Sequence, residues 1–207
     1  MRDLGFNLNL GVMVNTHSFY SYTSDVDRAA RIGETITKRY AANRVFTAYQ
    51  YFPGGGDYTV PGMRIDASKA SLMDDDGRVF AQLIDATRDE HPMIMVNAVK
   101  VTSIDADHPV SLSKTIITDW LRKELGFDGV VITDDIEVGA AVAGMLIEDY
   151  AVRTINAGSD MVIVCKHPKH IKDVHDALTQ AVADGTISEA RLDEAVRRIM
   201  LMKFSNE

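Results

Sequence analysis

Short apolar runs alternate with amphipathic helical patterns along almost the whole chain, and this alternation limits the possible folds more than any other feature. Each run is continuously apolar, which is typical of strands buried on both faces. Strands that alternate with helices form parallel sheets, because each helix carries the chain back to the edge where the next strand begins. The sequence therefore predicts an α/β fold of about five parallel strand–helix units, with strands near residues 6–14, 45–52, 93–101, 129–133 and 160–165.

The predicted helices are bounded by residues that commonly cap helices. Ser24, Ser113 and Ser188 stand at expected N-caps, where a side-chain oxygen can accept a backbone N–H bond. Gly126 and Gly158 follow the ends of two helices, where a left-handed residue is often needed. The chain has 207 residues and no linker or low-complexity stretch, so we expect a single domain over residues 1–207.

The composition limits the classes of partner that the protein can bind and the cell compartments in which it is expected. A formal net charge of −8 argues against nucleic-acid binding, because phosphate recognition needs a basic face. No apolar run approaches the ~20 residues of a membrane span, and the start of the chain lacks a signal-peptide pattern. Cys165 is the only cysteine, which excludes an internal disulfide and favours a reducing, cytoplasmic location. Its place at the end of an apolar run predicts a thiol in the strand core rather than a catalytic nucleophile.

One segment carries a long and specific motif. Residues 121–135 read LRKELGFDGVVITDD, which resembles the nucleophile signature of the family 3 glycoside hydrolases. In that family the aspartate directly after the Ser/Thr is the nucleophile, so the resemblance implies this role for Asp134. Trp120 and Glu137, beside the segment, depart from the residue types usual at their positions.

Four further segments line up with the same family in the same order, at residues 7–14, 51–57, 155–161 and 195–199. Together they cover nearly the whole chain and are most similar to the single-domain β-N-acetylhexosaminidases. The resemblance implies a (β/α) barrel that hydrolyses β-glucosides or N-acetylglucosaminides, with a small carbohydrate or aryl-linked substrate. No cofactor is expected. Barrel enzymes place their chemistry at the carboxyl ends of the strands, and Asp134 ends a buried apolar run.

The two neighbouring aspartates allow two interpretations. Consecutive strand residues point to opposite sides, so only one of Asp134 and Asp135 can face the barrel axis. Both could instead cap the next helix, as acidic residues after a strand often do. The surrounding signature favours the nucleophile interpretation for Asp134. A retaining glycosidase also needs a second group that protonates the leaving oxygen.

The chain departs from the family at two places that bear on catalysis. The family's Lys-His pair, which holds substrate hydroxyls, is replaced by Gln50 and Tyr51, which can still form hydrogen bonds. The Asp-x-His acid/base dyad of the single-domain hexosaminidases is replaced by Pro61 and Met63, and neither can transfer a proton. General acid catalysis contributes typically 10²–10⁴-fold, so ordinary glycosides should be poor substrates unless another group serves.

The remaining polar residues supply candidates for the missing roles. We predict Asp57 and Glu137 as candidate acid/base groups, although Asp57 is also a natural turn residue and Glu137 a natural first-turn residue of a helix. Asn97, near the end of the third predicted strand, and Arg64 join Gln50 and Tyr51 as candidate substrate-binding residues. Further candidates for the acid/base are Asp66, His17 and His108.

Three histidines near the start of a predicted helix raise the question of a metal site. His167, His170 and His175 are three and five residues apart, which places them poorly on one helical face. The sequence shows no acidic or thiolate partner that would complete a tetrahedral set. We therefore predict a solvated helix start and no metal site.

The strand count indicates an incomplete barrel. The family's domain has eight strands, and this chain resembles it from just before the fourth. Five parallel strands cannot close the usual barrel, and open edges expose unpaired backbone groups. We therefore expect a shortened barrel that homo-oligomerisation completes. Two other functions are compatible with the residues, namely an esterase-type hydrolase on the same scaffold and a non-catalytic sugar-binding or scaffolding subunit.

Overall fold

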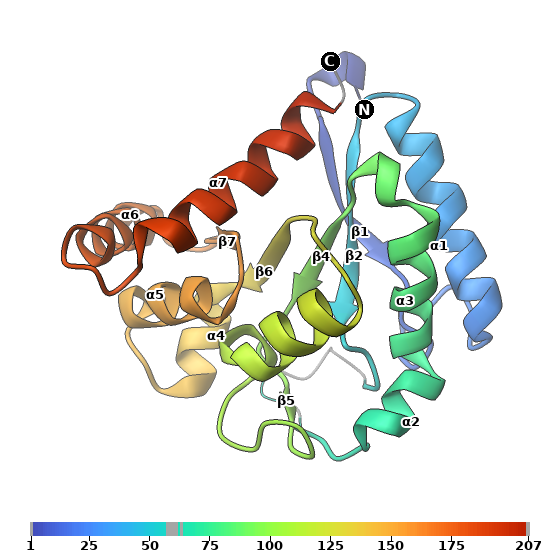
Figure 1. The fold of residues 1–207 in the computed structure, drawn as a ribbon, viewed down its shortest axis with the longest axis horizontal. Coiled ribbons are helices and arrows are strands. Elements are labelled where there is room, and N and C mark those ends of the chain that lie inside the picture. The colour runs from blue at the N-terminus through green and yellow to red at the C-terminus, as the bar shows by residue number, and fades with distance from the viewer. Residues whose placement is uncertain (1, 57–61, 63, 206–207) are drawn as a thin grey trace.

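The computed structural model describes residues 2–56, 62 and 64–205 of the chain. Five parallel strands form one sheet (Figure 1). Their order in the sheet follows their order in the chain: β1 (Leu8–Met13), β2 (Phe46–Phe52), β4 (Met93–Val96), β6 (Val131–Asp135) and β7 (Met161–Ile163). This architecture confirms the expected α/β fold and its five-stranded, partial barrel.

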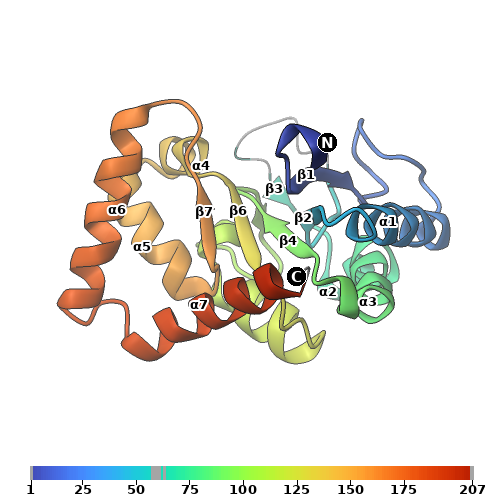
Figure 2. The ribbon, with the colours of Figure 1, turned by 90° about the horizontal axis from the view of Figure 1, so that it is seen from above.

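Helices in the connections between strands cover the outer face of the sheet (Figure 2), and the last helix packs against the inner face. The α-helices are α1 (Val26–Ala41), α2 (Lys69–Asp74), α3 (Asp76–Ala86), α4 (Ile136–Ala143), α5 (Ile147–Ala157), α6 (Pro168–Ala183) and α7 (Glu189–Phe204). Short 3₁₀ turns occupy η1 (Arg2–Leu4), η2 (Arg88–Glu90) and η3 (Val110–Leu112), and η4 (Thr115–Glu124) is wound as a π-helix. In the described part of the chain, no helix is long and apolar enough to cross a membrane.

Side-chain caps fix the starts of α1, α2, α4 and α7, with one difference from expectation. Ser188 accepts the Arg191 N–H at 3.2 Å and caps α7 as predicted. The cap of α1 is Asp25 instead of Ser24, and its carboxylate accepts the Arg28 N–H at 2.7 Å. A carboxylate at this position also interacts favourably with the helix dipole, which is a physical reason for the shift by one residue.

The two faces of the sheet are buried to different extents. On the outer face, Phe52 contacts Phe80 and Trp120 with ring centroids 5.3 and 5.0 Å apart, inside a core that is closed to solvent. On the inner face, Met93 and Met95 of β4 belong to one apolar cluster that also includes Met202, near the end of α7. Leu8 and Leu10 of β1 are only partly buried there. The inner face is therefore covered mainly by one helix, as expected for a barrel that is not closed.

Two sequence-based expectations about strands are wrong. The apolar stretch 93–101 is split into β4 and a separate strand β5 (Lys100–Val101), which pairs with β3 (Arg64–Ile65) in a second, two-stranded sheet. The last strand ends at Ile163, so Cys165 lies beyond it and is exposed. The expectation of a strand-core thiol fails because the chain has already turned toward α6.

A buried ion network closes the amino-terminal side of the sheet. The carboxylate of Asp160 is fully buried and lies 2.6 Å from Arg122 of η4, 2.9 Å from Arg191 and 3.3 Å from Arg198 of α7. The same carboxylate accepts the Val131 N–H of β6 at 3.0 Å. This network attaches α7 to the sheet and leaves the opposite, carboxyl-terminal edge free for a binding site.

Candidate active site

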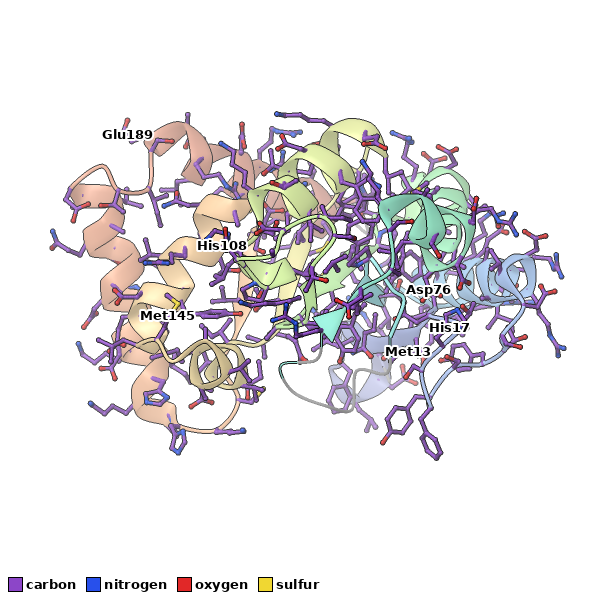
Figure 3. The ribbon with its side chains drawn as sticks, turned by 90° about the horizontal axis from the view of Figure 1, so that it is seen from below. Met13, His17, Asp76, His108, Met145 and Glu189 are labelled. Carbon is purple, nitrogen blue, oxygen red and sulfur yellow. The ribbon has the colours of Figure 1, made fainter. Side chains whose placement is uncertain are left out.

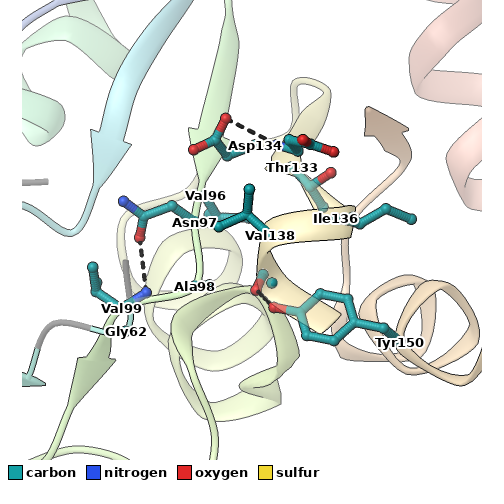
Figure 4. A pocket seen from close by; sticks show the side chains of 13 residues that line it. Gly62, Val96, Asn97, Ala98, Val99, Thr133, Asp134, Ile136, Val138 and Tyr150 are labelled. Carbon is teal, nitrogen blue, oxygen red and sulfur yellow. Dashed lines mark hydrogen bonds between the residues drawn. The ribbon is translucent and has the colours of Figure 1, made fainter. Parts of the chain in front are cut away.

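The carboxyl ends of β4 and β6 meet at a small pocket of about 70 Å³ (Figure 4). In parallel α/β structures this edge is where binding and catalytic side chains gather. The pocket is lined by residues of both strand ends, of α4 and of α5, including Asn97, Thr133, Asp134, Val138 and Tyr150. The structure therefore brings Asp134 and Asn97, both predicted as site residues, to the same pocket.

The two aspartates at the end of β6 have different tasks. Asp135 caps α4, because its carboxylate accepts the Glu137 N–H at 3.1 Å. The Asp134 carboxylate lies at the pocket and accepts only a local bond of 2.9 Å from the Asp135 N–H among its described hydrogen bonds (Figure 4). Thr133, just before them, accepts the Ile163 N–H at 3.1 Å and fixes the end of β6 to β7. The capping interpretation thus holds for Asp135, and Asp134 presents its carboxylate to the pocket.

The surroundings of Asp134 disfavour its charge. Burial raises the pKa of Asp134 above its usual value; the charge of Asp135 adds to this, and the Asp135 N–H opposes it. Burial likewise raises the pKa of Tyr51 and of Tyr150 to about 12, and the negative charge of Asp134 acts in the same direction on both phenols. Both tyrosines are therefore protonated at neutral pH, close enough to Asp134 to sense its charge.

Gln50 and Tyr51 end β2 beside a second, larger hollow. This hollow measures about 540 Å³ and is lined by both residues together with Met13 and Tyr20. Asn15 holds Tyr51 in place: its amide donates to the Tyr51 carbonyl at 3.0 Å and its side-chain oxygen accepts the Tyr51 N–H. The Gln50–Tyr51 and Phe52–Pro53 peptide bonds are cis. Gln50 and Tyr51 thus both line this hollow, and Tyr51 is also close enough to Asp134 to sense its charge.

A buried aspartate supports the glycine loop that follows β2. Asp76 accepts hydrogen bonds from the Thr16 N–H at 2.6 Å, the Thr16 hydroxyl at 2.7 Å and the Gly55 N–H at 2.7 Å. Figure 3 shows Asp76 beside the loop after β1, which also carries His17. A Cβ on Gly54 would lie 2.0 Å from the Cβ of Asp76. The close approach requires glycine there and explains why the loop is glycine-rich.

Glu137 lies in an environment that does not suit a proton donor. Its buried carboxylate accepts the backbone N–H groups of Lys166 and His167, and it contacts the Nδ1 atoms of His167 and His170 at 2.6 Å each. Burial alone would raise the pKa of Glu137, but the hydrogen bonds from Lys166 and from the two rings outweigh it and lower the pKa to about 2. A group ionised at such low pH is a poor general acid. These contacts argue against the predicted acid/base role.

Two of the other acid/base candidates are Asp57 and His17. Asp57, with Pro61 and Met63, lies outside the described residues. His17 contacts Asp75, and this hydrogen bond raises the pKa of His17.

Three further candidates lie away from the Asp134 pocket. His108 contacts Asp105 at 3.2 Å in the loop after β5. Asp66, after β3, accepts a hydrogen bond from the Thr102 hydroxyl. Arg64 of β3 is exposed and is not among the residues that line the Asp134 pocket. The structure therefore does not bring Asp66, His108 or Arg64 to the nucleophile candidate.

The chain is similar in sequence to one family of known proteins. The family model described as "Glycosyl hydrolase family 3 N terminal domain" matches residues 8–202. This chain belongs to glycosyl hydrolase family 3. The match covers all five strands of the sheet, so the whole partial barrel is family 3 structure.

Curated proteins similar to the chain include hexosaminidases. The chain is 25% identical to "Beta-hexosaminidase A" of Pseudoalteromonas piscicida, over 98% of the chain and 38% of that protein. It is 30% identical to "Beta-hexosaminidase" of Actinobacillus succinogenes, over 85% of the chain and 52% of that protein. The chain spans about half the length of the curated relatives it matches.

Solved family 3 structures have the same fold. The chain superposes with a TM-score of 0.87 and 26% identity on a β-N-acetylglucosaminidase from Paenibacillus, covering 99% of this chain and 41% of that one. The β-N-acetylglucosaminidase from Thermotoga maritima gives a TM-score of 0.87 and 25% identity, with 100% and 46% covered. The partial barrel therefore has the fold of a part of each of these solved structures.

The structure adds residues to the family 3 site that sequence reasoning did not single out. Asn15 and Asp76 both act on the carboxyl end of β2, by fixing Tyr51 and Gly55. Asp76 belongs to an acidic run that reads from sequence as a helix start, and it does begin α3. Its burial could not be read from that run, because its hydrogen-bond donors lie in loops 21 and 60 residues away.

Proposed function

We propose that this family 3 chain is a glycoside hydrolase that acts on β-linked N-acetylglucosaminides, with Asp134 as its nucleophile. One observation carries the proposal: Asp134 ends β6 with its carboxylate at a pocket, while its neighbour Asp135 takes the helix-capping task. The names of the curated and solved relatives support the N-acetylglucosaminide class. β-Glucosides are the second sugar class to test.

The reaction follows from the position of Asp134. An oxygen of its carboxylate bonds to the anomeric carbon, the glycosidic C–O bond breaks, and water later hydrolyses the glycosyl ester. Partial exclusion of water around the carboxylate, which raises its pKa, also leaves it less shielded from the carbon it attacks. The protonated phenol of Tyr51 and the amide of Asn97 supply hydrogen-bonding groups for sugar hydroxyls.

The group that supplies a proton to the leaving oxygen determines which substrates can be hydrolysed. Glu137 is engaged as an ionised acceptor, so Asp57 remains of the two acid/base groups that we predict first from sequence. A phenolate with a low pKa leaves without full protonation, whereas a sugar alkoxide does not. Aryl glycosides should therefore be turned over better than disaccharides.

The decisive experiment compares two adjacent substitutions. Turnover of aryl β-N-acetylglucosaminides, aryl β-glucosides and aryl esters is measured for the wild type, Asp134→Asn and Asp135→Asn. Asparagine is a good N-cap, so Asp135→Asn preserves the start of α4 and serves as the matched control. We expect Asp134→Asn to lose at least about 10³-fold in glycoside turnover and Asp135→Asn to lose far less.

Other outcomes point to the alternative functions. Ester turnover that survives Asp134→Asn would indicate an esterase with another nucleophile on this scaffold. Absence of any turnover, together with sugar binding by the wild type, would indicate a binding or scaffolding subunit.

We also propose that a second copy of the chain covers the open inner face. Among the described residues, β1 and β7 each pair with a single strand, and apolar side chains are exposed before β1 and on the last turns of α7. They include Phe6 before β1 and Met200, Leu201 and Phe204 on α7. Sedimentation that shows only a monomer across micromolar concentrations would contradict this association.

A further inference from the structure

The strongest feature outside the Asp134 pocket is a cluster of three side chains that join α4 to the start of α6. Glu137 lies in the first turn of α4, His167 precedes α6, and His170 lies in its first turn. One nitrogen from each ring and one carboxylate oxygen all lie within 4.8 Å of one another. Figure 2 shows that the connection from β7 to α6 runs beside α4.

We propose that Glu137, His167 and His170 form a binding site for a divalent transition-metal ion such as Zn²⁺. Two imidazoles and one carboxylate are a common zinc ligand set, and three protein ligands leave a fourth position for water. The spacing that argued against a metal from sequence concerned the histidines alone. The acidic partner missing from that argument comes from α4, 30 residues before His167.

The orientation of the carboxylate supports a ligand role. Its Oε2 atom accepts the backbone N–H of Lys166, which holds the group in place. Its Oε1 atom then faces the Nδ1 atoms of both rings, each at 2.6 Å. Backbone donors that fix the second oxygen of a carboxylate are typical of the supporting shell around metal ligands.

The convergence of the rings also favours a metal ion. A structural hydrogen bond to Glu137 needs only one histidine, yet both rings direct the same type of nitrogen to one oxygen, with centroids 4.9 Å apart. Replacing these hydrogen bonds by metal–ligand bonds of ~2.0–2.2 Å requires only small side-chain shifts. Glu137 is buried, whereas His167 and His170 are at least one-third exposed, so an ion can enter from solvent.

The surrounding charge is compatible with a cation. Asp134 and Asp135 precede Glu137 within three residues. Lys166 and Lys169 are the basic residues next to the two histidines in the chain, with Lys169 paired to Asp173 at 3.5 Å. The start of a helix repels cations through its dipole, so the Glu137 carboxylate must offset this effect. Such a site would fasten α4, the helix that follows the nucleophile strand, to α6.

The test measures metal binding directly and does not depend on hydrolysis. Untagged protein is stripped with a chelator and titrated with Zn²⁺ by calorimetry at pH 7.5, and with Co²⁺ by visible absorption, which reports tetrahedral ligation. The same titrations are made on His167→Ala, His170→Ala and the double variant. His175→Ala is the matched control, because His175 lies on α6 outside the cluster and is exposed.

We expect one equivalent of metal in the wild type, at least a tenfold weaker binding in each single variant and none in the double variant. His175→Ala should bind like the wild type, as should Asp134→Asn, which separates this site from metal bound at the nucleophile. Equal binding by the wild type and the double variant would overturn the proposal, as would a wild type that binds no metal. The two histidines are partly exposed, so their variants should fold.

Discussion

At the scale of single residues, the proposed nucleophile Asp134 lies where its negative charge lowers the stability of the folded protein. Its folded pKa is raised, so the folded state binds more protons than the unfolded state between the two pKa values. Stability therefore falls as pH rises through that window and stays lower above it. Asp134→Asn removes the charge and keeps an oxygen for the Asp135 N–H.

We accordingly predict that Asp134→Asn unfolds at a higher temperature than the wild type at pH 7 while losing activity. The gain should be at most about 1 kcal/mol, or roughly 2–4 °C, because solvent reaches the carboxylate and reduces the effect. Thermal unfolding at pH 7 and pH 5 checks this, since the difference should narrow as pH falls. A variant that melts at or below the wild-type temperature at pH 7 contradicts the prediction.

Which site residues could be inferred from the sequence depends on how far along the chain their partners lie. The nucleophile role of Asp134 could be proposed from sequence because its motif consists of adjacent residues, 121–135. The roles of Glu137 and Asp76 could not, because their partners are 29 to 33 and up to 60 residues away. Contacts of this kind depend on how the elements pack, and single-sequence patterns carry little information about them.

At the scale of elements, the loop after β2 depends on one close contact. Gly54 has φ of +91°, and an added Cβ would lie 2.0 Å from the Cβ of the buried Asp76. Gly54→Ala should destabilise the fold by roughly 2–4 kcal/mol, from left-handed strain and steric overlap together. Turnover should fall as well, because the loop begins three residues after Tyr51. Urea unfolding and aryl glycoside assays measure the two effects.

Gly126→Ala is the control that introduces left-handed backbone strain without steric overlap. Gly126 has φ of +71°, and nothing lies within 4 Å of an added Cβ. Its substitution should cost only about 1–2 kcal/mol and leave turnover intact. Equal losses of stability in the two variants would mean that the contact with Asp76 is unimportant.

Element boundaries were the least predictable part of the fold. The stretch 93–101 reads as one strand because it is almost wholly apolar, yet β4 ends at Val96. Asn97 then leaves the sheet, with its side-chain oxygen accepting the Val99 N–H at 3.2 Å. Lys100 and Val101 pair instead with Arg64 and Ile65. The end of β4 was therefore determined by strand pairing with residues distant in the sequence and not by local composition.

At the scale of the whole molecule, the open barrel makes the attachment of α7 important. The number and order of the strands could be predicted, because each strand is a buried apolar run followed by a helix. The path of α7 could not, because it depends on the contacts of Asp160 with Arg122, Arg191 and Arg198. This carboxylate joins η4, the start of β7 and α7, which covers the inner face.

We therefore predict that Asp160→Asn destabilises the protein by about 3–5 kcal/mol, because it leaves buried guanidinium groups without their shared counter-charge. Asp128→Asn is the control: Asp128 pairs with Arg197 and Arg198, but its side chain is 63% exposed, so its loss should cost at most about 1 kcal/mol. Urea unfolding measures both. If α7 depends on Asp160, its amide hydrogens should also exchange faster in Asp160→Asn under native conditions, while those of α1 stay protected. Equal unfolding free energies for the two variants would show that α7 is attached by its apolar contacts, through Met202 and Ile199, and not by charge.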